Sequence, residues 1–93
     1  MPPLAETRHA AMRRQQRAIP PFVVGLLMEQ GASMRHDGAE VYYVDKEARR
    51  RIRRTLGDRI HVAVEGYLDA YVVCADDGRV ITTGWRTARL RRT

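Results

Sequence analysis

A dense run of basic side chains between residues 46 and 54 is the strongest chemical signal in the sequence. Six of these nine residues are Lys or Arg. If the run is helical, at about 100° per residue, Ala48, Ile52 and Leu56 share one face, toward a core. Arginines four residues apart repel each other and add nothing to helix stability. The pattern therefore favours contact with a polyanion, through Arg49, Arg50, Arg53 and Arg54. A solvated arginine-rich face is the alternative.

A second basic run follows the last apolar stretch and extends from Trp85 to Arg92. Trp85 offers an aromatic face, and Arg86 beside it offers a guanidinium that can grip phosphate with two hydrogen bonds. A core tryptophan followed by a frayed basic tail is the alternative, and for Trp85 itself we favour the core. We expect Arg86 to be held by the strand before it, and we assign nucleic-acid contacts further along to Arg89, Arg91 and Arg92.

Histidine and cysteine give weaker signals. His9, His36 and His61 lack the spacing of metal ligands, so no metal and no cofactor is expected. His9 lies in a polar helical stretch and is a candidate general acid or base, although such residues more often cap or pack. Cys74 lies in an apolar strand and is expected to be an inert core residue.

The composition predicts one small domain with a polyanionic partner. The chain has 93 residues, 44% of them hydrophobic, and a net charge of +6 from seventeen basic and eleven acidic side chains. A single cysteine is typical of a reducing compartment, so we expect a cytoplasmic location. No apolar run is long enough to span a membrane, and the N-terminus lacks a secretory signal. Residues 1–7 are expected to form a flexible N-terminus.

The first half of the chain predicts two helices and a hairpin. A polar helix over Glu6–Arg17 ends before Pro20, and Pro21 begins a second, apolar helix that stops at Gly31. Two extended runs, Ala32–His36 and Ala39–Val44, flank the turn sequence Asp37-Gly38.

The second half predicts an arginine-rich helix and another hairpin. Asp45 caps a helix that continues to about Leu56, before Gly57-Asp58. Residues 59–66 suit either a strand or a helical turn. Leu68–Cys74 and Arg79–Trp85 then flank a turn at residues 76–78. This order predicts an α+β fold with helices on one face of an antiparallel sheet of about four strands.

Two stretches resemble a family of small bacterial proteins. The first is His9-Ala10, Arg13 and Arg17-Ala18-Ile19, and the second runs from Leu68 to Thr82 with Asp76-Asp77-Gly78 at its turn. Similar domains share the RelE/BrnT-like fold of toxin–antitoxin ribonucleases, which implies one such domain over residues 1–93. The chain departs from the family at Ala18, where Gly is usual, and at Arg14, where Met is frequent.

The resemblance implies a toxin-type protein that acts on RNA as a metal-independent endoribonuclease. In such an enzyme the 2′-hydroxyl attacks the adjacent phosphate while cations stabilise the transition state. Arg86 matches the position of the family's clamp, with His9 or Lys46 to move protons, and an acidic antitoxin-like protein would be a second partner. No Tyr or His follows Trp85, unlike in several such nucleases. This absence favours the alternatives, a non-catalytic nucleic-acid-binding accessory or a protein-interaction module with a basic surface.

Overall fold

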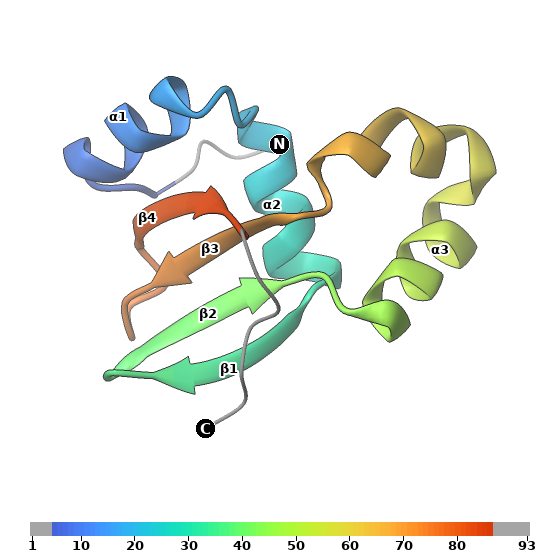
Figure 1. The fold of residues 1–93 in the computed structure, drawn as a ribbon. Coiled ribbons are helices and arrows are strands. Elements are labelled where there is room, and N and C mark those ends of the chain that lie inside the picture. Colours follow the sequence, from blue (N-terminus) through green and yellow to red (C-terminus); the bar gives the residue numbers. More distant parts are fainter. Residues whose placement is uncertain (1–4, 87–93) are drawn as a thin grey trace.

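Helices and a four-stranded antiparallel sheet make up this protein, as the computed structural model shows for residues 5–86 (Figure 1). The elements follow in the order α1 (Arg8–Gln16), α2 (Pro21–Gln30), β1 (Ala32–His36), β2 (Ala39–Tyr43), α3 (Lys46–Val64), the 3-10 helix η1 (Glu65–Tyr67), β3 (Ala70–Cys74) and β4 (Val80–Trp85). The α+β class predicted from the sequence is confirmed.

The sheet has the simplest antiparallel topology, β1-β2-β3-β4, with each strand beside its neighbour in sequence. Both hairpins turn where the sequence predicts. Asp37 and Gly38 both have positive φ, 49° and 77°, as a tight two-residue turn requires. Gly78 supplies a φ of 84° in the second turn. The strands after these turns run parallel to each other, so β2 and β4 end at the same end of the sheet.

The core lies between the sheet and α2. Alternate residues of β3, namely Ala70, Val72 and Cys74, are buried. They share a core with the buried residues of α2, which are Val23, Val24, Leu26 and Leu27. The helix therefore buries four of its apolar side chains, whereas Phe22 at its start is 45% exposed. Gly31 ends it in a tight space, where a side-chain methyl would collide with the backbone carbonyl oxygens of Leu27 and Tyr43.

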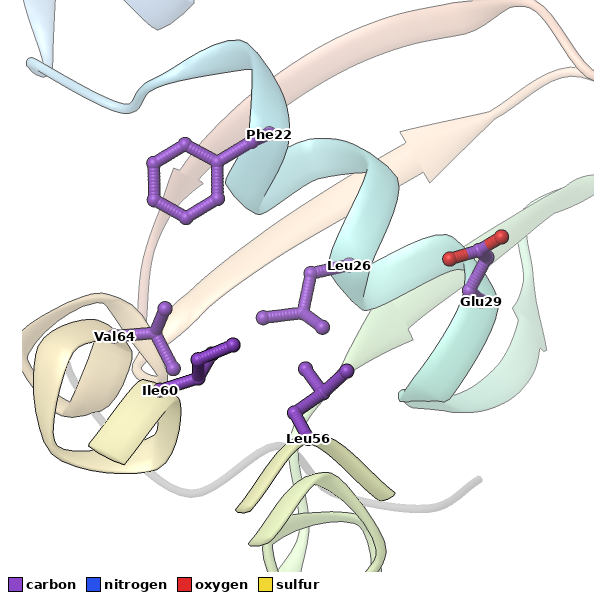
Figure 2. Close-up of a pocket in the computed structure, with 6 residues that line it drawn as sticks. All are labelled: Phe22, Leu26, Glu29, Leu56, Ile60 and Val64. Carbon is purple, nitrogen blue, oxygen red and sulfur yellow. The ribbon is translucent and has the colours of Figure 1, made fainter. Parts of the chain in front are cut away.

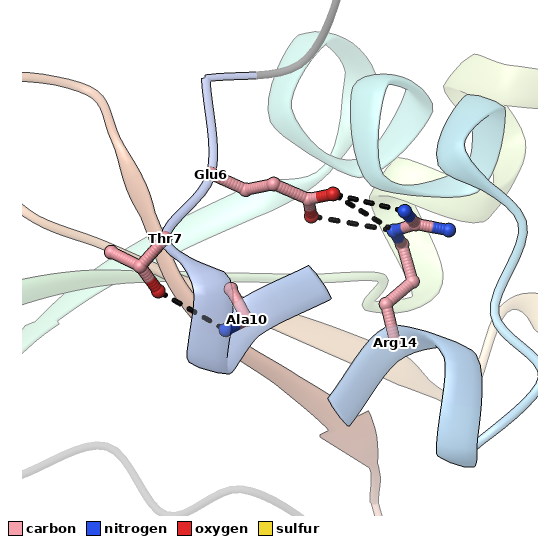
Figure 3. Close-up of polar contacts among 4 residues, drawn as sticks. All are labelled: Glu6, Thr7, Ala10 and Arg14. Carbon is pink, nitrogen blue, oxygen red and sulfur yellow. Dashed lines mark hydrogen bonds and ion pairs between the residues drawn. The ribbon is translucent and has the colours of Figure 1, made fainter. Parts of the chain in front are cut away.

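The expectation of a flexible N-terminus is wrong for residues 5–7. Glu6 forms a parallel bridge to Val80, with the Thr7 amide donating to the Val80 carbonyl at 3.0 Å. This short segment satisfies backbone groups on the free edge of β4. Glu6 also accepts hydrogen bonds from Arg14, and the Thr7 hydroxyl accepts one from the Ala10 amide at 3.1 Å (Figure 3). The Thr7 cap is the reason that α1 begins at Arg8 and not at Glu6.

The ambiguous stretch after residue 58 is helical. Gly57 has φ 86° and ψ 164°, so α3 consists of two segments, residues 46–56 and 58–64, joined at a sharp break. The first segment ends where the sequence predicts, because glycine adopts this left-handed φ without steric cost. The chain then resumes helical geometry and does not enter a strand.

Leu27 offers a test of the buried helix. Its side chain is fully buried, so Leu27→Ala should lower the free energy of unfolding by about 2–5 kcal/mol, because apolar burial decreases and a cavity is left behind. Met12, which is 52% exposed, provides the control, and Met12→Ala should change stability by less than about 0.5 kcal/mol. Denaturant unfolding measures both. Equal midpoints for the two variants would contradict the burial of Leu27 in the core.

Candidate nucleic-acid interface

Asp45 fixes the start of α3. Its carboxylate Oδ1 accepts a hydrogen bond from the Ala48 amide at 2.7 Å, as the predicted cap requires. Ala48 and Ile52 are fully buried, and Leu56 packs at the edge of the same core. The helical period then turns the opposite face of the first segment toward solvent.

The outward side of this segment carries four exposed cations, which we call the basic face: Lys46, Arg50, Arg53 and Arg54. Within residues 5–86, the side chains of Lys46, Arg50 and Arg54 form no hydrogen bond or ion pair. Arg49 lies half-buried beside the basic face. Of the four α3 arginines predicted to contact nucleic acid, Arg50, Arg53 and Arg54 are therefore exposed, whereas Arg49 is half-buried.

Arg53 is the member of the basic face with a described partner. Its Nε donates to Asp58 Oδ1 at 2.7 Å across the Gly57 break. The hydrogen bond and the charge of Arg53 lower the pKa of Asp58, and the same contacts raise the pKa of Arg53. Both side chains are well exposed, so an approaching phosphate can compete for Arg53.

Arg51 points in another direction and holds two helices together. Its Nε and Nη2 donate to the carbonyl oxygen of Gln30 at 3.1 and 2.6 Å. Gln30 is the last residue of α2, where carbonyl groups lack a partner within the helix. A cation at this end also interacts favourably with the helix dipole. Arg51 therefore contributes to the structure and is separate from the basic face.

Arg86 is engaged in contacts within the protein. Its backbone amide donates to the Asp69 carbonyl at 2.7 Å, and its Nη2 donates to the Val44 carbonyl at 2.9 Å. The guanidinium lies 5.9 Å from the centre of the Tyr43 ring and 3.6 Å from an Asp69 carboxylate oxygen. With its side chain 16% exposed, Arg86 ties the end of β4 to the junction of β2 and α3.

The three residues predicted to catalyse do not come together. Arg86 contacts Val44, two residues before Lys46, so these two cations lie at the same end of the sheet. His9 lies in the first turn of α1, which starts beside Val80 at the beginning of β4. Arg86 follows the other end of this six-residue strand, about 20 Å from Val80 at about 3.3 Å per residue. His9 is therefore separate from the other two.

Two arginines of the first resembling stretch, Arg14 and Arg17, have structural partners that no sequence motif indicates. Arg14 forms a bidentate pair with Glu6, at 2.9 and 3.3 Å. Arg17 donates to the Thr83 carbonyl at 2.6 Å, and the indole of Trp85 donates to the Arg17 carbonyl at 2.9 Å. Trp85 also packs against the core, in line with the core interpretation of this residue. These partners lie up to 68 residues apart, so no local pattern in the sequence indicates them.

Three further expectations from the sequence concern the C-terminal arginines, metal binding and membrane spanning. The nucleic-acid contacts assigned to Arg89, Arg91 and Arg92 lie outside the described residues. Across residues 5–86, no group of three or more His, Cys, Asp or Glu side chains is arranged to hold a metal ion. None of the helices in this range combines the length and apolar character needed to cross a bilayer.

Comparisons with known protein families, curated proteins and solved structures return no match for this chain. The resemblance to RelE/BrnT-like proteins therefore stays a prediction.

Arg86 can be tested as a structural residue. Arg86→Gln removes the charged donor from the Val44 carbonyl, and we expect a decrease of about 1–3 kcal/mol in the free energy of unfolding. Arg50→Gln removes the same charge from an exposed position and should leave stability nearly unchanged. Denaturant unfolding compares the two. If Arg86→Gln were as stable as Arg50→Gln, the hydrogen bond to Val44 would not contribute to the stability of the fold.

The Arg53–Asp58 pair predicts a measurable titration. Because Arg53 lowers the pKa of Asp58, the pair's contribution to stability is present at neutral pH and disappears as the pH falls through the folded-state pKa. Arg53→Gln should raise the pKa of Asp58 toward the ordinary aspartate range, measured by NMR of the carboxyl carbon. Arg54→Gln is the control, because it removes an equal charge without this hydrogen bond. Equal pKa changes in both variants would contradict a specific pair.

Proposed function

We propose that this chain binds RNA through the basic face of α3. The observation that carries the proposal is the exposure of Lys46, Arg50, Arg53 and Arg54 on one side of a capped, anchored helix. From the first to the last of these residues the helix rises about 12 Å, which allows contact with more than one phosphate. The net charge of +6 supports approach to a polyanion.

The chemistry of this face favours the phosphate backbone over base edges. Its side chains are guanidinium and ammonium groups, which bind phosphate through charge and hydrogen bonds. It has no Asn or Gln, the side chains that read adenine with paired hydrogen bonds. The proposal therefore implies binding that depends strongly on salt and weakly on sequence.

RNA is the preferred nucleic acid because the sequence motifs resemble those of proteins that act on RNA. A competition experiment with single-stranded RNA and duplex DNA of equal length tests this preference. An acidic protein that competes with RNA for the basic face is the alternative partner. An intracellular RNA ligand also agrees with the cytoplasmic location inferred from the single cysteine.

Binding, without cleavage, is the activity that the geometry supports best. A metal-independent endoribonuclease needs its phosphate clamp and its proton-transfer groups around one phosphate. Arg86 is bonded to Val44 and His9 lies near the other end of β4. Incubation of labelled RNA in the presence of a chelator separates the two activities. Cleavage that Arg86→Lys abolishes while the variant stays folded would favour the endoribonuclease.

Salt-dependent binding tests the basic face directly. In the double variant Arg50→Gln/Arg54→Gln the buried side chains Ala48 and Ile52 are unchanged, so the chain should fold. Affinity for RNA should fall about equally for different sequences. The slope of log K against log salt should decrease by about one unit for each phosphate that the variant no longer binds. Fluorescence anisotropy over a series of salt concentrations measures this slope.

A matched variant controls for net charge. Arg35 and Arg79 lie beside the two hairpin turns, at the end of the sheet away from Lys46. Arg35→Gln/Arg79→Gln also removes two positive charges. It should decrease the slope of log K against log salt less than the α3 double variant does. If both double variants decrease the slope equally, the effect comes from overall charge and the basic face is not the binding site.

A further inference from the structure

An apolar groove lies between α2 and the second segment of α3 (Figure 2). Its volume is about 200 Å³, and its lining consists of Phe22, Leu26, Glu29, Leu56, Ile60 and Val64. Phe22 and Ile60 are 45% and 46% exposed, a high value for such large apolar side chains. Large apolar side chains that are exposed together at one concave site favour contact with a partner.

The charges at the groove narrow the choice of partner. Glu29 is the charged residue in the lining. It is exposed and forms no ion pair within residues 5–86. An acidic partner segment would meet this carboxylate and be repelled. The groove therefore fits an apolar surface that carries a cation beside it.

The second segment of α3 is itself such a surface. Arg59, Val62 and Ala63 are all exposed on the side of the segment that lies next to Ile60 of the groove lining, and Arg59 forms no ion pair with any of the described residues. Arg59 and Ala63 are four residues apart and lie on the same face of the helix. The same chain therefore carries a groove beside the unpaired Glu29 carboxylate and an apolar surface beside the unpaired Arg59 guanidinium. The two surfaces have complementary charges.

The spacing on the two helices matches. On α2, Gly25 and Glu29 are four residues apart, and the helix rises about 6 Å between them, as it does between Arg59 and Ala63. There is open space above Gly25, because a Cβ built there meets no atom within 4 Å. If α3 of one copy crosses α2 of the other copy in the antiparallel direction, Arg59 lies beside the other copy's Glu29. Ala63 then lies over the other copy's Gly25.

We propose that two copies of this chain form a twofold-symmetric dimer through the α2–α3 groove. The second α3 segment of each copy covers α2 of the other, so that every contact occurs twice. The dimer buries Phe22 and Ile60 of both copies and forms two Glu29–Arg59 ion pairs. These pairs oppose the repulsion between two chains of net charge +6. The proposal is independent of RNA binding.

A charge swap tests the dimer in the full chain, purified free of nucleic acid. Sedimentation velocity over a range of concentrations should show the parent mass rising from 10.7 kDa toward twice that value. Glu29→Arg and Arg59→Glu each place like charges together, and each should weaken dimerisation at least about tenfold. The double variant Glu29→Arg/Arg59→Glu restores opposite charges in reversed order, and dimerisation should return.

Controls with equal charge changes keep the result specific. Glu47→Arg and Arg8→Glu alter exposed residues away from the groove and should dimerise more strongly than the groove variant of the same charge. Thermal unfolding checks that every variant is folded. A parent chain that stays at 10.7 kDa at all concentrations would overturn the proposal. A dimer that both single variants leave intact, or that the double variant fails to restore, would also overturn it.

Discussion

The direction of α3 depends on how the chain is held at Val44 and Asp45, where β2 ends and the helix begins. The Val44 carbonyl accepts a hydrogen bond from the Arg86 guanidinium at 2.9 Å, and the Asp45 side chain accepts one from the Ala48 amide at 2.7 Å. One contact ties the junction to the end of β4, and the other fixes the first helical turn. The Arg51 guanidinium also donates to the Gln30 carbonyl at the end of α2, and this hydrogen bond attaches α3 to α2. Because these contacts come from three elements, the basic face has a defined position on the protein.

Four half-buried arginines of this chain and the outward arginines of α3 differ in their acceptors. Arg14, Arg17, Arg51 and Arg86 donate to a carboxylate or to backbone carbonyls within the protein. Guanidinium suits this use because its several N–H donors can satisfy carbonyl groups at the end of a helix, after a strand or on a sheet edge. The outward arginines of α3 lack such acceptors among the described residues, apart from the exposed pair formed by Arg53. Net charge alone therefore overstates how much of the basic surface can bind a partner.

Features with local causes could be predicted from the sequence, and contacts between distant segments could not. The cap at Asp45 and the break at Gly57 each depend on the conformational preference of one residue. Helical periodicity likewise defines the direction of the basic face. By contrast, the hydrogen bond between Arg86 and Val44 joins residues that are 42 positions apart in the sequence. The position of His9 depends on the bridge between Glu6 and Val80, which places the start of α1 beside β4. Candidate catalytic residues could therefore be named from their types, while the distance between them depends on tertiary packing.

The break at Gly57 explains how α3 can serve both a core and a groove. Residues spaced by four drift about 40° around a straight helix at each step, because four residues turn 400°. Over the four steps from Ala48 to Val64 the drift would reach about 160°, which would turn the last apolar residues away from the first. The break changes the direction of the chain before Ile60, so that Ile60 and Val64 can face α2. One element thereby carries a cationic surface on its first segment and an apolar surface on its second.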